Sequence, residues 1–422
     1  MAKDGTPADG QSGPAPRLEQ EDGRWWGMYG PWRITSHFQP IFSLTHRRAV
    51  GHEALLRAWG PGGPVSPAQV LSSGTTPREL VLLDRLCRAV HVHNFARTPC
   101  ADHWLFLNVH PAVFAAGGMG ENRWMSLSRE TLGRFGIAPG QVVLEVTEDA
   151  IREEASFDAA VARAREFGCL LALDDFGAGH SNFDRVWRIR PDIVKLDRSV
   201  VAQAGREARI ARVVTQMVSL LHECGAMVLV EGVETAQEAD FALESDVDFV
   251  QGYYFAPPAP QLHPPGVPDA VDAVWARFDE RAALADQGQR RRMAPYVRAM
   301  ADAAARYAAG EEFASACAGF LALPDVELCF LIDEHGLQAA PNLTTARFDG
   351  RPVAFAPLAD VRGARWSRRP YFRRAVEAEG RVHVTRPYLS VHGARLCLTV
   401  SVGIRRQGRL MVLGGDIALE PD

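Results

Sequence analysis

The chain has 422 residues, of which 47% are hydrophobic and 23% are charged, and its formal net charge is −5. This length allows two or three domains, and the negative charge gives no general attraction to nucleic acid. No run of about 18 apolar residues occurs, so we expect no membrane span. The seven cysteines are odd in number and form no Cys-x-x-Cys pair, which favours a reducing compartment and a cytoplasmic location.

The first 24 residues are rich in Gly, Pro, Gln and charged residues and show no apolar periodicity. Such a composition predicts a disordered N-terminal tail over residues 1–24. The segment also lacks a long apolar core, so we do not expect a signal peptide in it.

Strand-like apolar runs that end in acids or amides recur over the first 255 residues, with helix-like segments between them. Strands and helices that alternate at spacings of roughly 20 to 40 residues indicate parallel βαβ units. Many such units predict a closed α/β barrel, in which functional groups gather at the carboxyl ends of the strands. The polar residues on or just beyond these runs are Glu53, Asn108, Glu145, Glu148, Asp174, Asp175, Lys195, Asp197, Glu231, Glu234 and Gln251.

The adjacent acids Asp174 and Asp175 end the apolar run Leu170–Leu173, and Gly177 and Gly179 predict a turn directly after them. Two neighbouring carboxylates repel each other unless a cation neutralises them, and a divalent metal is the usual cation. Any one of the strand-end acids is also typical of a solvated surface turn. Because a barrel would bring many of them to one mouth, we expect an oxygen-rich metal site there.

The expected site offers hard oxygen ligands without paired His or Cys, which favours Mg²⁺ or Mn²⁺ over Zn²⁺. Such ions, often in pairs, suit the hydrolysis of phosphate esters, because they bridge phosphate oxygens, generate hydroxide and stabilise the leaving oxygen. Lys195 beside the acids would orient or help deprotonate the attacking water, or stabilise negative charge on the phosphate.

Seven motifs follow one another along the chain: Glu53-Ala54-Leu55, NVHP, LEVTE, LDDFGAGHSN, IVKLD, VEGVET and QGYYF. In this combination the segment from about Trp32 to Pro258 resembles the EAL family of cyclic di-GMP phosphodiesterases. The resemblance implies a TIM-like barrel that hydrolyses one phosphodiester of cyclic di-GMP to linear pGpG with Mg²⁺ or Mn²⁺, two ions per site. Ala178 and His180 depart from the common pattern, and we expect them to alter loop dynamics and rate more than the presence of activity.

The resemblance also implies roles for individual residues. The metal ligands would be Glu53, Asn108, Glu145, Asp174, Asp175 and Glu231. Lys195 would contact the catalytic water, with Glu231 and Gln251 close to it. Glu148 would brace the loop after Asp175, and Glu234 would support the site from the loop that it shares with Glu231. The substrate groove would be lined by Gln39, Leu56, Arg57 and Gln251, with Arg57 paired to a phosphate.

After Pro258 the chain changes character. The proline-dense segment PAPQLHPPGVP predicts a domain boundary. Apolar residues at positions 271, 274, 275 and 278 predict an amphipathic helix, and a second helix over Met293–Ala309 is expected to be broken from the first near Gln287–Gly288. From Val326 on, strands with one helix among them predict an α+β domain. We therefore expect a barrel over residues 25–260, a linker with helices over 261–320 and a smaller domain over 321–422.

The run RWSRRPYFRRAVEAEGRVHVTRPYLS, with FLIDEHG before it and GGDIAL after it, resembles the Cache (PAS-like) sensory fold. Without a membrane span, it would be a cytoplasmic variant. The basic stretch over residues 362–374 admits three interpretations: a solvated helix face, a partner-docking face, or part of a site for a small ligand. The residues expected at such a ligand site are Trp366, Tyr371, Arg373, Tyr388 and Asp416.

Three functions are compatible with these patterns. The complete set of acids, amides and lysine favours an active phosphodiesterase, which we expect to be a homodimer regulated by a small ligand of the C-terminal domain. A catalytically silent cyclic di-GMP receptor, or an interaction scaffold, would tolerate the loss of Asp174 or Lys195, and neither residue is missing.

Overall fold

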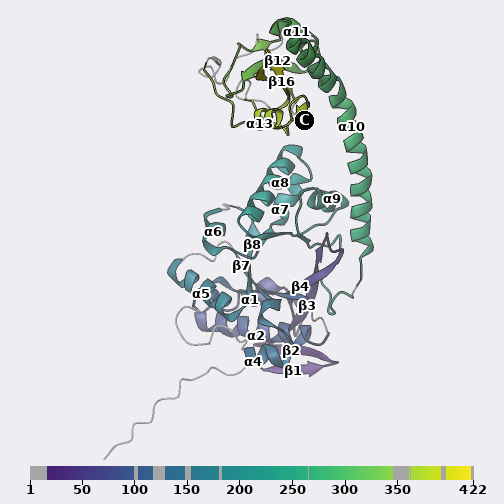
Figure 1. Ribbon diagram of the computed structural model, residues 1–422. Helices are drawn as coiled ribbons and strands as arrows, with labels where there is room; N and C mark the ends of the chain where they lie inside the picture. Colours follow the sequence, from purple (N-terminus) through teal and green to yellow (C-terminus); the bar gives the residue numbers. More distant parts are fainter. Residues whose placement is uncertain are drawn as a thin grey trace, which may run out of the picture. The chain divides into compact units, whose positions relative to one another are not determined.

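The computed structural model describes residues 17–98, 103–116, 129–147, 154–179, 183–264, 266–345, 361, 363–390 and 396–419. The chain divides into two compact units, Met1–Glu280 and Arg281–Asp422. The first is a barrel of strands surrounded by helices, and the second is a smaller sheet with helices (Figure 1). No helix in the described ranges is both long enough and apolar enough to cross a bilayer.

Eight strands close the barrel of the first unit. Seven of them run parallel: β4 (Arg48–Gly60), β6 (Trp104–Asn108), β7 (Val142–Thr147), β8 (Leu170–Phe176), β9 (Ile193–Leu196), β10 (Met227–Val230) and β11 (Phe249–Val250). The eighth, β3 (Trp32–Ser43), is antiparallel to both β4 and β11 and closes the ring. The predicted TIM-like α/β barrel is therefore confirmed, with one antiparallel strand that the sequence patterns did not indicate.

A short N-terminal hairpin extends the sheet beyond the barrel. Strand β1 (Leu18–Glu21) pairs with β2 (Arg24–Tyr29), which pairs with β3, and β5 (Gly63–Val65) pairs with β4. Leu18 packs against an apolar cluster that contains Ile34, and Asn94 accepts a hydrogen bond from the Trp25 amide at 2.9 Å. The expected tail over residues 1–24 is thus wrong for residues 18–24, because these contacts hold them in the sheet.

One layer of apolar side chains fills the barrel interior. Each member comes from a different strand: Ile41, Phe106, Val143, Ala172, Ile193, Leu229 and Phe249. On the eighth strand, β4, a Cβ on Gly51 would lie 2.9 Å from the ring of Phe106, so only glycine leaves room for that ring. The layer closes the interior on one side, so the space nearer the carboxyl ends of the parallel strands has an apolar floor.

Helices cover the outside of the barrel with their apolar faces. In α8, for example, Val214, Val218 and Leu221 are buried at helical spacing. These helices are α1 (Pro67–Leu71), α2 (Pro77–Phe95), α3 (Pro111–Ala116), α4 (Arg129–Arg134), α5 (Glu154–Phe167), α6 (Phe183–Ile189), α7 (Arg198–Ala204), α8 (Ala208–Glu223) and α9 (Ala236–Glu244), with a 3-10 turn, η2, over Pro139–Gln141.

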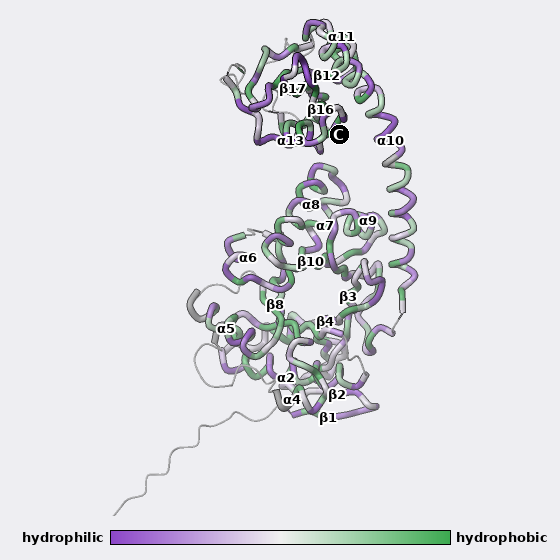
Figure 2. The backbone as a smooth tube through the Cα atoms, viewed as in Figure 1, coloured by the Kyte–Doolittle hydropathy of each residue, from purple (hydrophilic) through white to green (hydrophobic). Residues whose placement is uncertain are grey.

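Helix α10 (Asp269–Ala308) is continuous, so the break expected near Gln287–Gly288 is wrong. A single glycine costs a helix only about 1 kcal/mol relative to alanine, and the residues around Gly288 are good helix formers. Hydrophobic and hydrophilic residues mix along the whole helix (Figure 2). Pro295, a residue type that usually breaks or kinks a helix, also lies inside α10 without ending it.

The first turns of α10 belong to the barrel rather than to a linker. Val271 and Val274 are fully buried in the barrel core. The indole of Trp275 donates to the Leu44 carbonyl at 2.8 Å, and Arg277 donates to Asp240 at 2.9 Å. The barrel unit consequently extends beyond residue 260, the limit that the proline-dense segment suggested.

The second unit is built on an antiparallel sheet. Its strands lie in the order β13-β12-β17-β16-β14, with β15 also on β16. Apolar clusters cover both faces, one with α10 and α11 and the other with α13. The expected α+β architecture is confirmed. The elements are α11 (Phe313–Leu321), β12 (Val326–Asp333), β13 (Leu343–Thr344), α13 (Pro370–Glu377), β14 (His383–Val384), β15 (Tyr388–Leu389), β16 (Leu396–Arg406) and β17 (Arg409–Ala418).

The packing of α10 predicts where the barrel can be truncated. A chain that ends at Leu262 should be less stable than one that ends at Glu280, by about 3–6 kcal/mol, because full burial of two valine side chains contributes about that much. Urea unfolding followed by tryptophan fluorescence would measure the difference. Equal unfolding midpoints for the two chains would contradict this assignment of the barrel boundary.

Candidate active site

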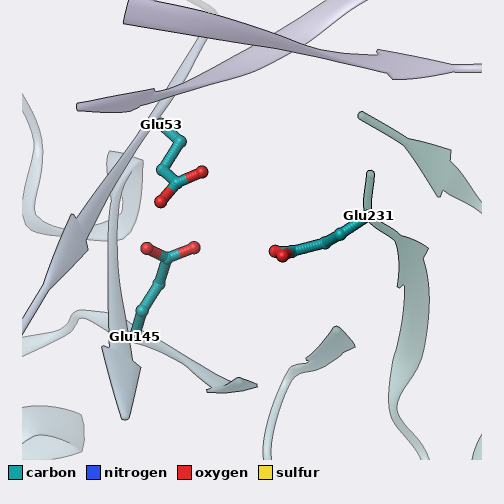
Figure 3. A group of neighbouring side chains, drawn as sticks. All are labelled: Glu53, Glu145 and Glu231. Carbon is teal, nitrogen blue, oxygen red and sulfur yellow. The ribbon is translucent and has the colours of Figure 1, made fainter. Parts of the chain in front are cut away.

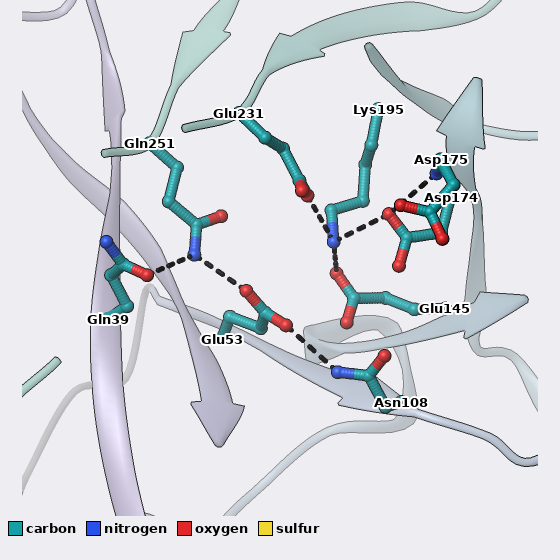
Figure 4. A network of polar contacts seen from close by, with 9 residues as sticks. All are labelled: Gln39, Glu53, Asn108, Glu145, Asp174, Asp175, Lys195, Glu231 and Gln251. Carbon is teal, nitrogen blue, oxygen red and sulfur yellow. Dashed lines mark hydrogen bonds and ion pairs between the residues drawn. The ribbon is translucent and has the colours of Figure 1, made fainter. Parts of the chain in front are cut away.

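The polar residues of the site lie two positions along each strand from the apolar layer. On β6, Asn108 follows Phe106, and on β8, Asp174 follows Ala172. Because side chains alternate with a period of two, these polar residues face the same interior as the layer. Every barrel strand contributes one: Gln39, Glu53, Asn108, Glu145, Asp174, Lys195, Glu231 and Gln251 (Figure 4).

Lys195 is the centre of this polar layer. Its side chain is 1% exposed, and its ammonium forms ion pairs with Glu145, Asp174 and Glu231. The distance from Nζ to Asp174 Oδ1 is 3.1 Å. Three carboxylates from three strands therefore share one buried cation.

Glu53 is held by amides rather than by the lysine. Asn108 donates to Glu53 Oε1 at 2.9 Å, and Gln251 donates to Glu53 Oε2 at 2.7 Å. Gln251 also lies 3.2 Å from Gln39 Oε1, and Gln39 donates to the Ala256 carbonyl at 3.2 Å. This chain of bonds fixes both carboxylate oxygens of Glu53 with its charge directed into the barrel mouth.

Backbone bonds beyond the strand ends position two of these side chains. The Glu231 amide donates to the Leu196 carbonyl at 3.1 Å, and the Gln251 amide donates to the Val230 carbonyl at 2.9 Å. Directly after Gln251, a Cβ on Gly252 would lie only 2.1 Å from the Val233 carbonyl oxygen. A glycine is thus required where the loop after β11 meets the loop that carries Glu231.

The end of β8 and the turn that follows it need an unusual backbone conformation. Asp175 has φ 58° and Gly177 has φ 101°, so the chain enters the left-handed region directly after Asp174. The Asp175 amide donates to Asp174 Oδ1 at 3.0 Å. The turn leaves Asp175 exposed while Asp174 stays buried, which separates the two neighbouring acids by environment.

Burial and mutual repulsion shift the proton affinities in the site. Burial raises the pKa of Glu145 well above its usual range, because the nearby charges of Glu53, Asp174 and Glu231 add to it and Lys195 only partly offsets them. Burial raises the pKa of Glu231 to about 8 despite the ion pair with Lys195. Without a further cation, these two acids therefore favour their protonated forms, because one lysine does not offset burial and the charges of the neighbouring acids.

The environment of Lys195 restricts its chemistry. Burial alone would lower the pKa of Lys195, but the charges of Asp174, Glu145 and Glu231 outweigh it and raise the pKa well above its usual value. A protonated lysine donates hydrogen bonds. It can orient a water molecule or stabilise a phosphate charge, whereas taking a proton from water would require the neutral amine.

The described residues include one group of acids whose spacing suits a metal ion. Glu53, Glu145 and Glu231 offer carboxylate oxygens that lie within 4.8 Å of one another and point toward one another (Figure 3). Glu145 Oε2 is buried and accepts no hydrogen bond from the part of the chain that the structure describes. An unsatisfied buried carboxylate oxygen costs free energy that a hard cation would recover.

The remaining expected residues lie apart from this network. Leu56 is buried in an apolar cluster with Ile34, and Arg57 donates to the Leu56 carbonyl at 2.8 Å. Glu234 forms an ion pair with Arg198 at 2.8 Å. Glu148 lies outside the described residues.

Sequence reasoning missed two contributors to the site. Arg198 follows Asp197 at the end of β9, and its side chain is mostly exposed, so no local pattern marked it as the partner of Glu234. The Ala256 carbonyl, which accepts a hydrogen bond from the Gln39 amide, belongs to the backbone, so no side-chain motif could have indicated it.

Comparison with known proteins places the barrel in a family. Residues 32–258 match the family model described as EAL domain. The chain belongs to the EAL domain family.

Several relatives carry names that specify an activity. The chain is 35% identical over 160 residues to "Cyclic di-GMP phosphodiesterase RocR" of Pseudomonas aeruginosa, a match that covers 38% of this chain and 40% of that protein. It is 27% identical over 237 residues to "Cyclic di-GMP phosphodiesterase PdeL" of Escherichia coli, covering 55% of this chain and 63% of that protein. The chain thus spans less than two thirds of the length of these curated relatives.

A solved structure resembles nearly the whole chain. The YkuI protein of Bacillus subtilis, described with an EAL domain and in complex with substrate cyclic di-GMP and calcium, superposes with a TM-score of 0.77. The match covers 92% of this chain and 96% of that one at 20% sequence identity. At this identity the likeness establishes a shared fold, including a C-terminal unit after the barrel.

The pKa of Glu231 predicts a pH-dependent effect of metal on stability. Its folded value of about 8 lies above the ordinary 4.5, so the stability it contributes is complete below about pH 4.5 and is lost as the pH rises through 8. Mg²⁺ should offset that loss and should therefore raise the melting temperature more at about pH 8.5 than at about pH 6.

Thermal unfolding with Mg²⁺ and with EDTA at both pH values would measure this effect. The variant Glu231→Gln is the control, because it removes the titrating carboxyl and should remove most of the difference between the two pH values. An equal rise in melting temperature at both values in the unsubstituted protein would show that these acids do not bind the ion.

Proposed function

We propose that the protein hydrolyses one phosphodiester bond of cyclic di-GMP, giving linear pGpG, with divalent cations bound at the barrel mouth. The observation that carries this proposal is the convergence of Glu53, Glu145 and Glu231 on one space beside the buried Lys195. Relatives whose names specify cyclic di-GMP phosphodiesterase activity support the choice of substrate. The calcium and cyclic di-GMP of the YkuI complex support a site of this kind on this fold.

The proposed cation ligands are the oxygen donors around the mouth. Glu53 and Glu145 lie on β4 and β7, with Asn108 on the intervening strand β6, and Asp174 and Glu231 come from the strands on either side of Lys195. Asp175, exposed at the turn, would contribute to a second ion. Bound divalent cations would polarise the phosphodiester and lower the pKa of a water molecule that they hold. We favour Mg²⁺ or Mn²⁺ because the donors are oxygens.

The other residues would orient the reactants. Lys195, held as a cation by its three acidic neighbours, would donate to the attacking water or to a phosphate oxygen. Gln251 and Gln39 hold Glu53 in place through its Oε2 side. Arg57, half-buried on β4, would pair with a substrate phosphate. Glu234, fixed by Arg198, would support the loop that carries Glu231.

Incubation of the purified protein with cyclic di-GMP and Mg²⁺ or Mn²⁺, followed by chromatography, tests the activity. We expect linear pGpG to form and its formation to stop when EDTA is added. Glu53→Gln and Asp174→Asn should each lower turnover by more than about 100-fold, because loss of a group that merely supports a metal ligand already costs about 10- to 100-fold.

Asp158→Asn is the matched control. This acid pairs with Arg188 on the barrel exterior at 2.7 Å and lies outside the proposed machinery, so turnover should stay close to that of the unsubstituted protein. Binding of cyclic di-GMP without turnover would instead identify a silent receptor, and the absence of both binding and turnover would favour an interaction scaffold.

We further propose that the C-terminal unit regulates the barrel, in a cytoplasmic homodimer. One continuous helix, α10, contributes to both units, and the cysteines among the described residues are all free thiols, as expected in a reducing compartment. A ligand of the C-terminal unit can change turnover only if it binds two states of the protein with different affinity.

Turnover of a chain that ends at Glu280 tests the regulation. We expect its rate to differ from that of the full chain by at least about fivefold, the lower end of typical coupling between sites. The barrel core contacts of α10 remain in this shorter chain, so a difference would not reflect loss of the fold. Identical turnover and identical metal dependence in the two chains would contradict regulation by the C-terminal unit. The proposed homodimer is tested separately, by measuring the mass of both chains with light scattering.

A further inference from the structure

One short turn supports the polar layer of the barrel from outside it. This turn, residues 252–256, follows strand β11, and we call it the β11 turn. Directly before it, the Gln251 side chain donates to Glu53 at 2.7 Å, and at its other end the Ala256 carbonyl accepts from Gln39 at 3.2 Å (Figure 4). A shift of the β11 turn would therefore move two of the groups that hold the proposed cation ligands.

The β11 turn is also bonded to the loop that carries Glu231. The Tyr254 amide donates to the Val233 carbonyl at 2.9 Å, and the Val233 amide donates to the Gln251 carbonyl at 3.1 Å. Val233 lies two residues after Glu231, so these two bonds join the loops after β10 and β11 close to the site. The position of Tyr254 thus affects acidic residues on two sides of the barrel mouth.

Helix α10 holds Tyr254 through one arginine. Arg277 Nη2 donates to the Tyr254 hydroxyl at 3.1 Å. The same guanidinium is fixed by Asp240 of α9, since Nε donates to Oδ1 at 2.9 Å and Nη2 lies 2.7 Å from Oδ1. Asp240 is only 7% exposed, so water competes little for these bonds. An arginine held in this forked way has little freedom, and its remaining donor keeps the tyrosine hydroxyl in one place.

We propose that Arg277 is a positioning residue for the cation ligands and acts on them through Tyr254. Its effect reaches Glu53 through the Gln251 side chain, and it reaches Glu231 through the loop that the β11 turn contacts. This inference rests on the proposed function, because that proposal assigns these acids to the cation. Without the bond from Arg277 the turn is free to move. The ligands must then be ordered when the cation binds, which weakens binding.

Two variants of the full chain remove the bond with little other change. Tyr254→Phe removes the hydroxyl and keeps the ring, which packs against the barrel core. Arg277→Lys keeps a positive charge beside Asp240 but loses the planar fork that binds two partners at once.

Titration with Mn²⁺, followed by electron paramagnetic resonance of the free ion, measures cation binding without any substrate. We expect each variant to bind Mn²⁺ about tenfold more weakly, since groups that support metal ligands typically contribute about 10- to 100-fold. The Mn²⁺ concentration that gives half-maximal turnover should rise by the same factor, and excess Mn²⁺ should restore turnover. A role in folding alone would lower the melting temperature and leave the Mn²⁺ affinity unchanged.

Asp272→Asn is the matched control on the same helix. Arg47 Nε donates to Asp272 Oδ1 at 3.2 Å, so this pair also joins α10 to the barrel, but at the turn between β3 and β4. We expect this variant to bind Mn²⁺ as tightly as the unsubstituted protein. An equal loss of affinity in the control would overturn the proposal, because docking of α10 in general would then explain the effect.

Unchanged Mn²⁺ affinity in both Tyr254→Phe and Arg277→Lys would also overturn it. If Arg277→Lys does not fold, Tyr254→Phe decides. Turnover separates this inference from the proposed function. If the unsubstituted protein binds Mn²⁺ but forms no pGpG, the proposed function fails, and the Mn²⁺ affinities of the variants still support or overturn the role of Arg277. Absence of Mn²⁺ binding by the unsubstituted protein would overturn both.

Discussion

The ion-paired lysine inside the barrel is the interaction on which the site depends. Lys195 is almost completely removed from water, and three carboxylates from β7, β8 and the end of β10 share its charge. Removing one partner from a buried ion pair costs about 3–5 kcal/mol, while replacing the whole group with apolar residues is often neutral or stabilising. Stability alone therefore gives no reason for this cluster. Its value lies in the excess of carboxyl groups over cations that it keeps in a confined space.

That excess follows from the geometry of the barrel. Each strand contributes one apolar residue to the floor and one polar residue two positions along it, so eight separate segments converge within one mouth. The amides of Asn108 and Gln251 hold Glu53, and Lys195 holds Glu145, Asp174 and Glu231. A divalent cation would meet ligands that are already arranged, which limits the entropy lost on binding.

The sequence was sufficient to predict the barrel and most of the polar layer, because both follow from apolar runs that end in acids. Gln39 required the family resemblance. It lies on the antiparallel strand β3, where the polar residue comes two positions before the apolar residue Ile41 instead of after it. The hairpin at Leu18–Tyr29 and the continuity of α10 were missed for a different reason. Both depend on tertiary contacts, such as Asn94 with Trp25, or on a glycine penalty of about 1 kcal/mol that a long helix absorbs.

Anomalous diffraction from crystals grown with Mn²⁺ tests the central claim most directly. The account predicts manganese peaks within about 2.5 Å of carboxylate oxygens of Glu53 and Glu145, with the Lys195 ammonium released from at least one of its acidic partners. Crystals that show no manganese in the barrel, or manganese only at surface acids, would contradict the account and leave the buried lysine as the sole cation of the site.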